Sequence, residues 1–589
     1  MKIKHFFGLA VIAAMTASCS SNEDLGTAGP GTGTNEAGVG YATFTINLPS
    51  TNGTRADGDP TFEDGDATEY DVFNATLLVF KKPTAATAET SEGEYTFVEK
   101  VDLGSMQPWK NPNETGVTTQ AKITAKLSNV DKSGEYFALV LLNNGSGADA
   151  KVNLPTDQTT TYSAWNKADN ATNKFDKTDK GFYMANAPLY NAKGKNVTTL
   201  VAIDKDKIFP TEAQASSGDA AADIYVERGL AKVTLTTASK YEEVGGSTYV
   251  GDKVKISNWA LDVTNKKTFP IHNVDGLTTD YPEIWNNDAP ATTAPSNPSN
   301  PSNQRFVDNS EAIAKRVYWG IDPNYKNTDL CKEDADGTTV GTTAREKEFN
   351  YVKVNTDVTK DPTKPLYCLE NTFNLENMKQ GQTTRVIFKA SYTPKGFTEA
   401  DGKTFYKVGT SVALWKQKDL EDHIKAAVSK VIPVTTTDDI TIKLDAKGND
   451  ITAAGNHVIT AANFTVKGHD TVTKEEEKAV NDKVGLTEKA GISTYADGES
   501  YYIARIKHFG DVLTPWKSGV YGTNNLAYLG RYGMLRNNWY ELKVNSVSGP
   551  GYPSVPEVKP NTPDDEDDKY IKVSVKILKW AKRSQTVDL

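Results

Sequence analysis

The chain has 589 residues, a formal net charge of −10 at pH 7 and 38% apolar residues. This length predicts about two to four domains, each large enough for a core of its own. The modest acidity is spread along the chain, which excludes a basic surface for nucleic acid or anionic lipid.

The N-terminus has the pattern of a secretion signal, MKIK followed by the apolar FFGLAVIAAM and then TASCS. The apolar run is too short for a stable membrane-spanning helix. Ala17 and Ser18 directly before Cys19 are typical of a bacterial lipobox, in which the thiol is lipidated, with palmitate among its acyl chains. We therefore expect a signal peptide over residues 1–18 and a precursor held in the outer membrane as a lipoprotein through Cys19.

A first strand is predicted over residues 41–48, after a polar tether. Apolar side chains alternate there with polar ones, at Ala42, Phe44, Ile46 and Leu48. The next segment, STNGTRADGDPTFEDGD, is rich in turn residues and predicts an exposed loop with Arg55 in its middle. Residues 19–55 are interpreted as a propeptide that contains this strand.

The rest of the chain is dominated by strand patterns separated by turn residues, such as ATLLVFKK, EYFALVLLNN, TTRVIFKASYTP and NNWYELKVNSV. Their spacing predicts an all-β protein with two β-sandwich domains, over residues 56–238 and 239–548. Two segments look helical, LWKQKDLEDHIKAAVSKV and TKEEEKAVNDKV. Both are interpreted as short helical insertions packed on the second domain.

The C-terminus carries a second strand pattern after a spacer. Residues 549–568 are rich in Pro and acidic side chains, so we expect an extended and solvated linker. In residues 569–589, Ile571, Val573, Val575 and Ile577 alternate with polar residues, and Leu578 and Trp580 follow. Because no hairpin turn folds this strand back, it is expected to fill a groove on another molecule as a donor strand.

Motifs of catalysis or metal binding are missing from the sequence. The six histidines are scattered, no nucleophile elbow occurs, and the acidic clusters lack the ligand spacing of a calcium loop. We therefore predict no catalytic residue, no metal site, no cofactor and no enzymatic activity. Cys331 and Cys368 either form one disulfide or stay buried and reduced, and the sequence leaves both alternatives open.

The first and last strands carry the same alternation and could fill the same groove. A cut after Arg55 would release the first strand, and the strand of a second molecule could then replace it. Because donor and acceptor are different surfaces of one chain, such contacts do not close, and they generate a head-to-tail polymer.

Several stretches resemble the Bacteroidales fimbrillins, the type V pilins, and most closely the shaft subunits of the short Mfa-type fimbriae. These are the leader ending ASCS, the Arg-Ala of NGTRADGD, DIYVERGLAKV, ISNWALDV, RNNWYELKVNSV and the terminal LKWAKRSQTVDL. The resemblance implies two transthyretin-like β-sandwiches and an Arg-specific extracellular protease that cuts between Arg55 and Ala56.

The same resemblance implies a structural subunit of a fimbrium, or pilus, on the surface of a Gram-negative bacterium, assembled by donor strand exchange. Copies of the chain, an anchor subunit, a tip subunit and the protease would be its partners, and cell adhesion and biofilm formation its roles.

An alternative function is that of a surface glycan-binding lipoprotein, which shares the leader, the acidity and the β-sandwiches. Such proteins need exposed aromatic platforms, whereas Trp259, Trp319 and Trp539 fall inside apparent strands, which favours core packing. A carbohydrate-active enzyme is a third and weaker alternative.

Overall fold

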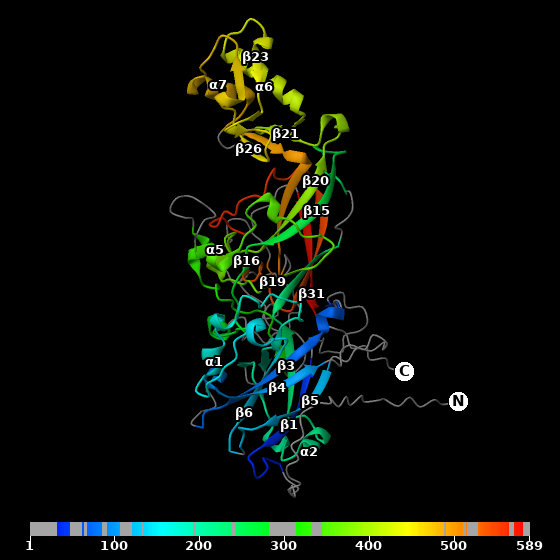
Figure 1. The fold of residues 1–589 in the computed structure, drawn as a ribbon, viewed down its shortest axis with the longest axis vertical. Coiled ribbons are helices and arrows are strands. Elements are labelled where there is room, and N and C mark those ends of the chain that lie inside the picture. The colour runs from blue at the N-terminus through cyan, green and yellow to red at the C-terminus, as the bar shows by residue number, and fades with distance from the viewer. Residues whose placement is uncertain are drawn as a thin grey trace, which may run out of the picture.

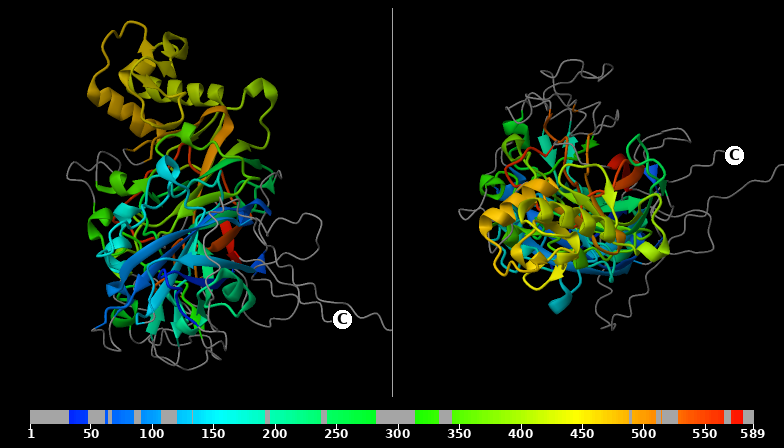
Figure 2. Two further views of the ribbon diagram at one scale, coloured as in Figure 1. Left: turned by 60° about the horizontal axis from the view of Figure 1, so that its bottom comes forward. Right: turned by 90° about the horizontal axis from the view of Figure 1, so that it is seen from above.

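The computed structural model describes residues 32–47, 62–63, 67–84, 91–106, 120–131, 133–191, 196–236, 242–281, 314–332, 344–487, 490–509, 514, 528–564 and 571–580. The molecule is elongated, and most of its described elements are strands, as predicted (Figure 1). Two β-rich domains follow one another along the long axis, and a smaller lobe with helices lies at one end (Figures 1 and 2).

The first domain is built from one long, folded sheet. Its order is β11-β1-β12-β7-β6-β3-β4, with β5 beside β1 and β10 beside β6. The strands are β1 (Gly40–Asn47), β3 (Val72–Lys81), β4 (Thr96–Met106), β5 (Gln120–Leu127), β6 (Tyr136–Leu142), β7 (Met184–Asn186), β10 (Val201–Ala202), β11 (Ile208–Phe209) and β12 (Ala222–Arg228), and the helices are α1 (Tyr162–Trp165) and α2 (Glu212–Ser217). Beside them lies a small sheet of β8 (Leu189–Asn191), β9 (Asn196–Thr198) and β17 (Ala314–Arg316).

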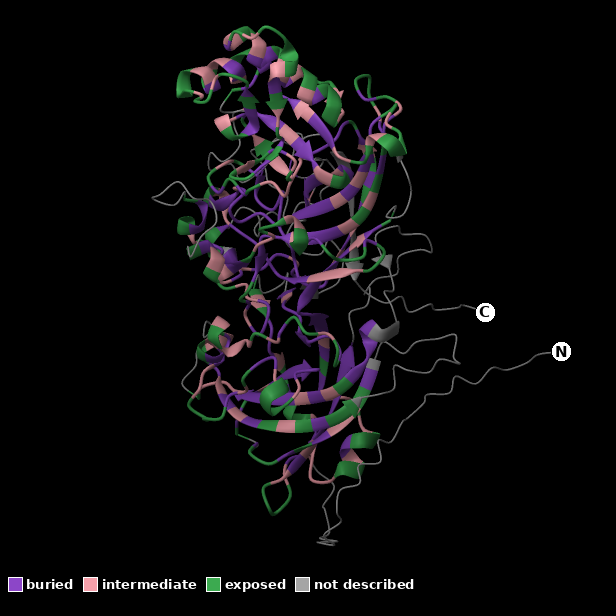
Figure 3. Ribbon diagram, turned by 45° about the horizontal axis from the view of Figure 1, so that its top comes forward, coloured by how far each residue is buried: buried purple, intermediate pink, exposed green. Residues whose placement is uncertain are grey.

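The inner face of this sheet encloses an apolar core to which β1, β3, β5, β6 and β12 all contribute. Phe44, Leu77, Val140 and Ile224 are fully buried in it. Figure 3 shows buried stretches running through the strands of this domain, with exposed residues in the loops and at intervals along some of the strands. The alternation read from the sequence therefore marks residues that fill a common core.

The second domain stacks two sheets on another core. One sheet has the order β19-β13-β30-β31-β2 and the other β14-β15-β20-β29. Their bounds are β13 (Leu230–Leu235), β19 (Leu366–Leu369), β30 (Asn538–Val547), β31 (Ile571–Trp580), β2 (Phe62–Glu63), β14 (Glu242–Glu243), β15 (Lys253–Asp262), β20 (Arg385–Thr393) and β29 (Glu499–Arg505), with β16 (Thr264–Asn265), β18 (Phe349–Asn350), α3 (Leu277–Asp280) and α5 (Ala344–Glu348) nearby. Trp259, Phe388 and Tyr540 are buried between the two sheets.

Buried polar contacts join the two domains. The Nδ1 atom of His272 lies 2.7 Å from Glu227 of β12, and the side-chain oxygen of Asn537 accepts from the backbone N–H of Arg228 at 3.1 Å. At the crossing from β12 to β13, a Cβ on Gly229 would lie 2.6 Å from the ring of Phe175. The junction is therefore tightly packed, which favours a fixed relation between the domains.

The two predicted helices, α6 (Gln417–Val431) and α7 (Lys474–Val484), are present and lie within the range expected for the second domain. They build a core of their own, however, in which Leu420, Ile424 and Val480 are fully buried. The lobe also contains β21 (Phe405–Val408), β22 (Leu414–Trp415), β23 (Ile440–Ile442), β24 (Asp445–Ala446), β25 (Asn449–Asp450), β26 (Gly455–His457), β27 (Phe464–Val466) and β28 (Ile492–Tyr495). It stands at the end of the molecule opposite to β1 and α2 (Figure 1).

The predicted solvated linker is wrong for residues 549–564, which run along the second domain as a strap. Val558 is 3% exposed and packs in an apolar cluster, and Asp564 is fully buried. The backbone N–H of Gln380 donates to the carbonyl of Thr562 at 2.9 Å, and the Thr383 hydroxyl donates to the Asp564 carboxylate at 2.9 Å. Backbone hydrogen bonds to the domain outweigh the extended preference of the prolines.

The expectation that the C-terminal strand finds no partner in its own chain is also wrong. Strand β31 pairs antiparallel with β30 from Val547 opposite Ile571 to Asn538 opposite Lys579, with one irregularity between Val544 and Ser546. Its other edge meets β2, which runs parallel to it. The strap returns the chain to the free edge of β30, which no local hairpin signal in the sequence could indicate.

Candidate functional site

The first predicted strand lies in the middle of a sheet. Strand β1 begins at Gly40 and ends at Asn47, close to the predicted range of 41–48. Ala42, Phe44 and Ile46 are each fully buried in the core of the first domain. Burying the two large side chains contributes about 3 to 6 kcal/mol, so this strand is part of the folded core.

Strand β1 is hydrogen-bonded on both edges. It pairs antiparallel with β5 over its whole length, from Gly40 opposite Leu127 to Asn47 opposite Gln120. On its other edge it meets β11 first and then β12, and it runs parallel to β12. Removal of β1 would therefore open a groove with unpaired backbone on both sides and an apolar floor, and such a groove recruits a strand.

The outer face of β1 is covered by α2. Thr43 is 1% exposed on this face, and its hydroxyl donates to the carbonyl oxygen of Ala215 in α2 at 2.8 Å. The hydroxyls of Thr43 and Thr124 lie 2.8 Å apart, which fixes Thr124 of β5 as the second partner. This helix begins at the cap residue Thr211, whose hydroxyl accepts from the backbone N–H of Gln214.

Sequence reasoning missed Thr43 because an alternating pattern assigns polar residues to solvent by default. The short segment that covers it, Glu212–Ser217, carries an N-cap signal in Thr211. This N-cap residue predicts the start of a helix, but it does not indicate which strand the helix will cover.

Other predicted site residues lie outside the described residues. These are the lipidation site Cys19, the last apolar position Leu48 of the first strand, and the cleavage pair Arg55 and Ala56. Strand β31 is described by its backbone and register, which place Ile571, Val573, Val575, Ile577 and Leu578 along β30 and Trp580 opposite Glu63 of β2. The roles predicted for all these residues stay predictions.

Both candidate disulfide partners are free and buried thiols. Cys368 lies in β19 opposite Ala231, and the Sγ atom of Cys331 lies 3.9 Å from the carbonyl oxygen of Asn377. Burial raises the pKa of each thiol to about 12. Of the two alternatives that the sequence left open, the structure therefore has the reduced thiols, and both stay protonated at neutral pH.

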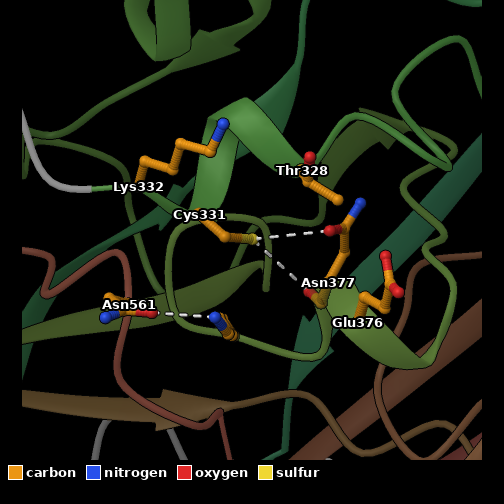
Figure 4. Close-up of a pocket in the computed structure, with 7 residues that line it drawn as sticks. Thr328, Cys331, Lys332, Glu376, Asn377 and Asn561 are labelled. Carbon is orange, nitrogen blue, oxygen red and sulfur yellow. Dashed lines mark hydrogen bonds between the residues drawn. The ribbon is translucent and has the colours of Figure 1, made fainter. Parts of the chain in front are cut away.

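Cys331 borders a cavity of about 400 Å³ in the second domain (Figure 4). Its other lining residues are Thr328, Lys332, Glu376, Asn377, Lys379 and Asn561. The ammonium of Lys379 donates to Asn561 of the strap at 2.8 Å. None of the described residues that line the cavity is a histidine that could activate the thiol, so these residues do not form the arrangement of a cysteine nucleophile.

Within the described part of the chain, no group of three His, Cys, Asp or Glu side chains lies close enough to hold a metal ion. Among the same residues, no helix has both the length and the apolar content needed to cross a bilayer.

The tryptophans bear on the glycan-binding alternative. Trp259 and Trp319 are fully buried, although Trp319 follows β17 instead of lying within a strand. The indole of Trp539 is covered by the ammonium of Lys232 at 3.9 Å and donates to Thr234 at 2.7 Å. These three residues form no exposed aromatic platform for a sugar.

A scan against protein-family models matches the C-terminal part of the chain. Residues 493–586 match the model described as "Major fimbrial subunit protein type IV, Fimbrillin, C-terminal". The C-terminal part of this chain is a fimbrillin C-terminal region. The resemblance read from the sequence is thereby supported, and the fimbrillin region contains β29, β30, the strap and β31 together.

Two solved structures align with this chain over most of its length. One is described as a candidate cell adhesion protein from Parabacteroides distasonis, at 11% identity and a TM-score of 0.35, covering 92% of this chain and 98% of that one. The other is the tip fimbrial protein Mfa3 from Porphyromonas gingivalis with a C-terminal truncation, at 11% identity and a TM-score of 0.27, covering 92% and 100%. Similarities this loose carry no argument, and a search of curated protein sequences finds no match.

Proposed function

We propose that the chain is a structural, non-enzymatic subunit of the fimbrial shaft that polymerises by replacing β1 of one copy with the C-terminal strand of the next. The central position of β1, buried on both faces and paired on both edges, is the observation that supports this most. A removable strand at this place leaves an acceptor groove, and a fimbrillin C-terminal region supplies the second strand.

The precursor reaches the outer membrane as a lipoprotein through Cys19, and an Arg-specific protease cuts between Arg55 and Ala56. The cut is needed because a strand attached to its own groove has an effective concentration on the order of millimolar. After the cut, β1 is tied to the domain only by non-covalent contacts, and a competing strand can take its place.

The donor strand must first leave its own chain. In the single molecule β31 pairs with β30 and β2, so release of this contact belongs to assembly. The strap anchors the base of the strand through Asp564, whose backbone N–H donates to Met378 at 3.3 Å. A strand that swings out from this anchor stays attached to the second domain and can reach a neighbouring subunit.

In the polymer each subunit donates its own β31 to one neighbour and accepts the β31 of another neighbour in the β1 groove of its first domain. The contact is heterologous and does not close, so a filament results. Anchor and tip subunits would end it, and the filament would serve adhesion and biofilm formation on the cell surface.

The test uses purified residues 20–589 treated with an Arg-specific protease, N-terminal sequencing, and a gel in SDS without heating. We expect a new terminus at Ala56 and a ladder of polymers. The matched control Arg55→Lys removes the cut and should leave only monomer. A chain that is cut at Arg55 and stays monomeric would contradict the proposal.

A second pair of variants separates the donor strand from general damage. Val575→Lys puts a charge on the apolar face of β31 and should abolish the ladder, whereas Lys576→Gln alters the next position and should keep it. Circular dichroism of both uncut variants checks that they fold. Equal polymer from the two variants would exclude β31 as the donor.

A further inference from the structure

The acceptor groove contains a polar position opposite its apolar floor. Thr43 is 1% exposed, and its hydroxyl bridges the carbonyl oxygen of Ala215 and the hydroxyl of Thr124, each at 2.8 Å. When β1 leaves, both groups lose this bond; the Ala215 carbonyl keeps the backbone N–H of Gly218 at 3.3 Å and Thr124 is half-buried, so each lost bond is worth about 0.5 to 1.5 kcal/mol. A replacing strand that supplies a small hydroxyl side chain here is therefore favoured.

Strand β31 contains one hydroxyl residue in the sequence IKVSVKILKW, and it is Ser574. We propose that Ser574 of the incoming subunit takes the place of Thr43, with the donor strand running in the same direction as β1. This inference rests on the proposed function, because it gives the register of the strand exchange suggested there.

The core positions agree with this register. It places Val573, Val575 and Ile577 where Ala42, Phe44 and Ile46 lie, as follows from the period of two. The larger valine at Ala42 offsets part of the volume lost at Phe44, so the total filling of the core changes little. Volume-conserving exchanges of this kind are the ones that cores tolerate best.

Other registers of the donor strand place lysine side chains at buried positions of the groove. A shift of one residue turns Lys572 and Lys576 into the apolar core. A shift of two that puts Lys572 at Thr43 buries an ammonium group at a position only 1% exposed. The opposite shift of two puts Lys576 there and also moves Lys579 into the core position of Ile46.

Charge at the rim of the groove fits as well. In the proposed register Lys576 takes the position of Thr45, which is 7% exposed, so its ammonium must extend along the strand to the exposed Asp223, the neighbour on β12. On the β5 side the neighbour is Lys122, whose ammonium is turned to the carbonyl oxygen of Gly218 at 2.7 Å. A carboxylate is thus available to the incoming lysine.

The direction of the donor strand is inferred from the longer of the two hydrogen-bonded ladders that β1 makes, the one with β5. Strand β1 is antiparallel to β5 over its whole length and parallel to β12 only from Phe44 to Asn47. Antiparallel pairing is slightly more stable per residue, so a donor that keeps the direction of β1 keeps the better ladder. Both directions bring a lysine beside Asp223, which therefore does not discriminate between them.

The test is disulfide trapping in the polymer made from residues 20–589. Ser574→Cys combined with Thr124→Cys should convert the ladder into one that survives heating in SDS and collapses to monomer on reduction. The hydroxyl oxygens of Thr43 and Thr124 lie 2.8 Å apart, so thiols at these two positions are within bonding reach. The two native thiols, at Cys331 and Cys368, are buried and give little background.

Matched pairs decide between registers and directions. Lys572→Cys with Thr124→Cys traps the polymer only if the strand is shifted by two residues. Lys572→Cys with Lys126→Cys traps the proposed direction, because Tyr41 lies opposite Lys126, and Lys572→Cys with Lys122→Cys traps the reverse one.

The outcomes separate this inference from the proposed function. A ladder that forms without heating but is trapped only by the shifted or reversed pair overturns the register or the direction, while strand exchange stands. A ladder trapped by none of the pairs overturns the placement of β31 beside β5. If no ladder forms with any variant or with the unmodified chain, the proposed function itself fails.

Discussion

Replacing Phe44 by alanine should damage the precursor and spare the polymer. The Phe44 ring is fully buried in the core of the first domain. Truncating a buried Phe to Ala costs about 3 to 5 kcal/mol, because transfer energy is lost and a cavity remains. For a domain of this size that loss lowers the melting temperature by roughly 6 to 20 °C.

The assay is thermal and denaturant unfolding of uncut residues 20–589, followed by the same measurement on the polymer. The matched control is Phe73→Ala, which truncates a phenylalanine that is 45% exposed in β3 of the same domain. It should cost less than about 1 kcal/mol. The Phe44→Ala polymer should be as stable as the unmodified one, because β1 has left.

Two results would refute this reasoning. If Phe44→Ala does not destabilise the precursor, β1 is not a strand of the folded core. If it weakens precursor and polymer equally, β1 is still in its groove after assembly, and strand replacement is wrong.

Three further outcomes are expected. Cys331 and Cys368 should react with thiol reagents at pH 8 only after unfolding, since burial raises the pKa of each thiol to about 12. Mass spectrometry of the alkylated chain measures this labelling. Rapid labelling of the native protein would contradict the prediction. Asp262→Asn should cost about 3 to 5 kcal/mol in urea unfolding, because it leaves Arg385, 2.7 Å away in a buried pair, without its anionic partner. Burial lowers the pKa of His508 to about 3, so below about pH 6.5 this histidine binds a proton in the unfolded chain but not in the folded protein. The free energy of unfolding should therefore fall by about 3 kcal/mol between pH 6.5 and pH 4. The His508→Gln variant should show a smaller dependence on pH in the same measurement.

An exposed counterpart serves as the control for Asp262→Asn. Asp149→Asn removes a carboxylate 2.6 Å from Lys180 on the surface, where an ion pair contributes little, so the free energy of unfolding should stay nearly unchanged. An equal effect of control and test variant would contradict the role given to burial.

Part of the site could be read from the sequence because it depends on local periods. The alternation of Ala42, Phe44 and Ile46 specified a strand with one buried face, and the structure buries all three. The apolar stripe of α6 likewise predicted that Leu420 and Ile424 face a core. Such patterns need only the geometry of one element.

Capping is a second local signal. Helix α7 begins after Thr473, whose side chain and that of Glu476 each accept from the other's backbone N–H. This capping box lies within four consecutive residues, so the start of the helix could be recognised in the sequence.

The path of the C-terminus needed the tertiary structure. The prolines and acidic residues of 549–568 favour an extended, solvated spacer, yet Val558 and Asp564 are buried against the second domain. Partners for the strap come from distant residues such as Gln380 and Thr383. Composition reports what a segment prefers in isolation and does not report which hydrogen bonds a neighbouring domain offers.

The sequence by itself determined that both ends of this protein carry a strand with one apolar face, because the alternation of side chains is set by the backbone within a single strand. Only the tertiary structure decided where those strands lie: β1 between β5 and β12 beneath α2, and β31 on the edge of β30. Strand edges carry the same N–H and C=O groups everywhere, so the choice of partner depends on packing between residues far apart in the chain.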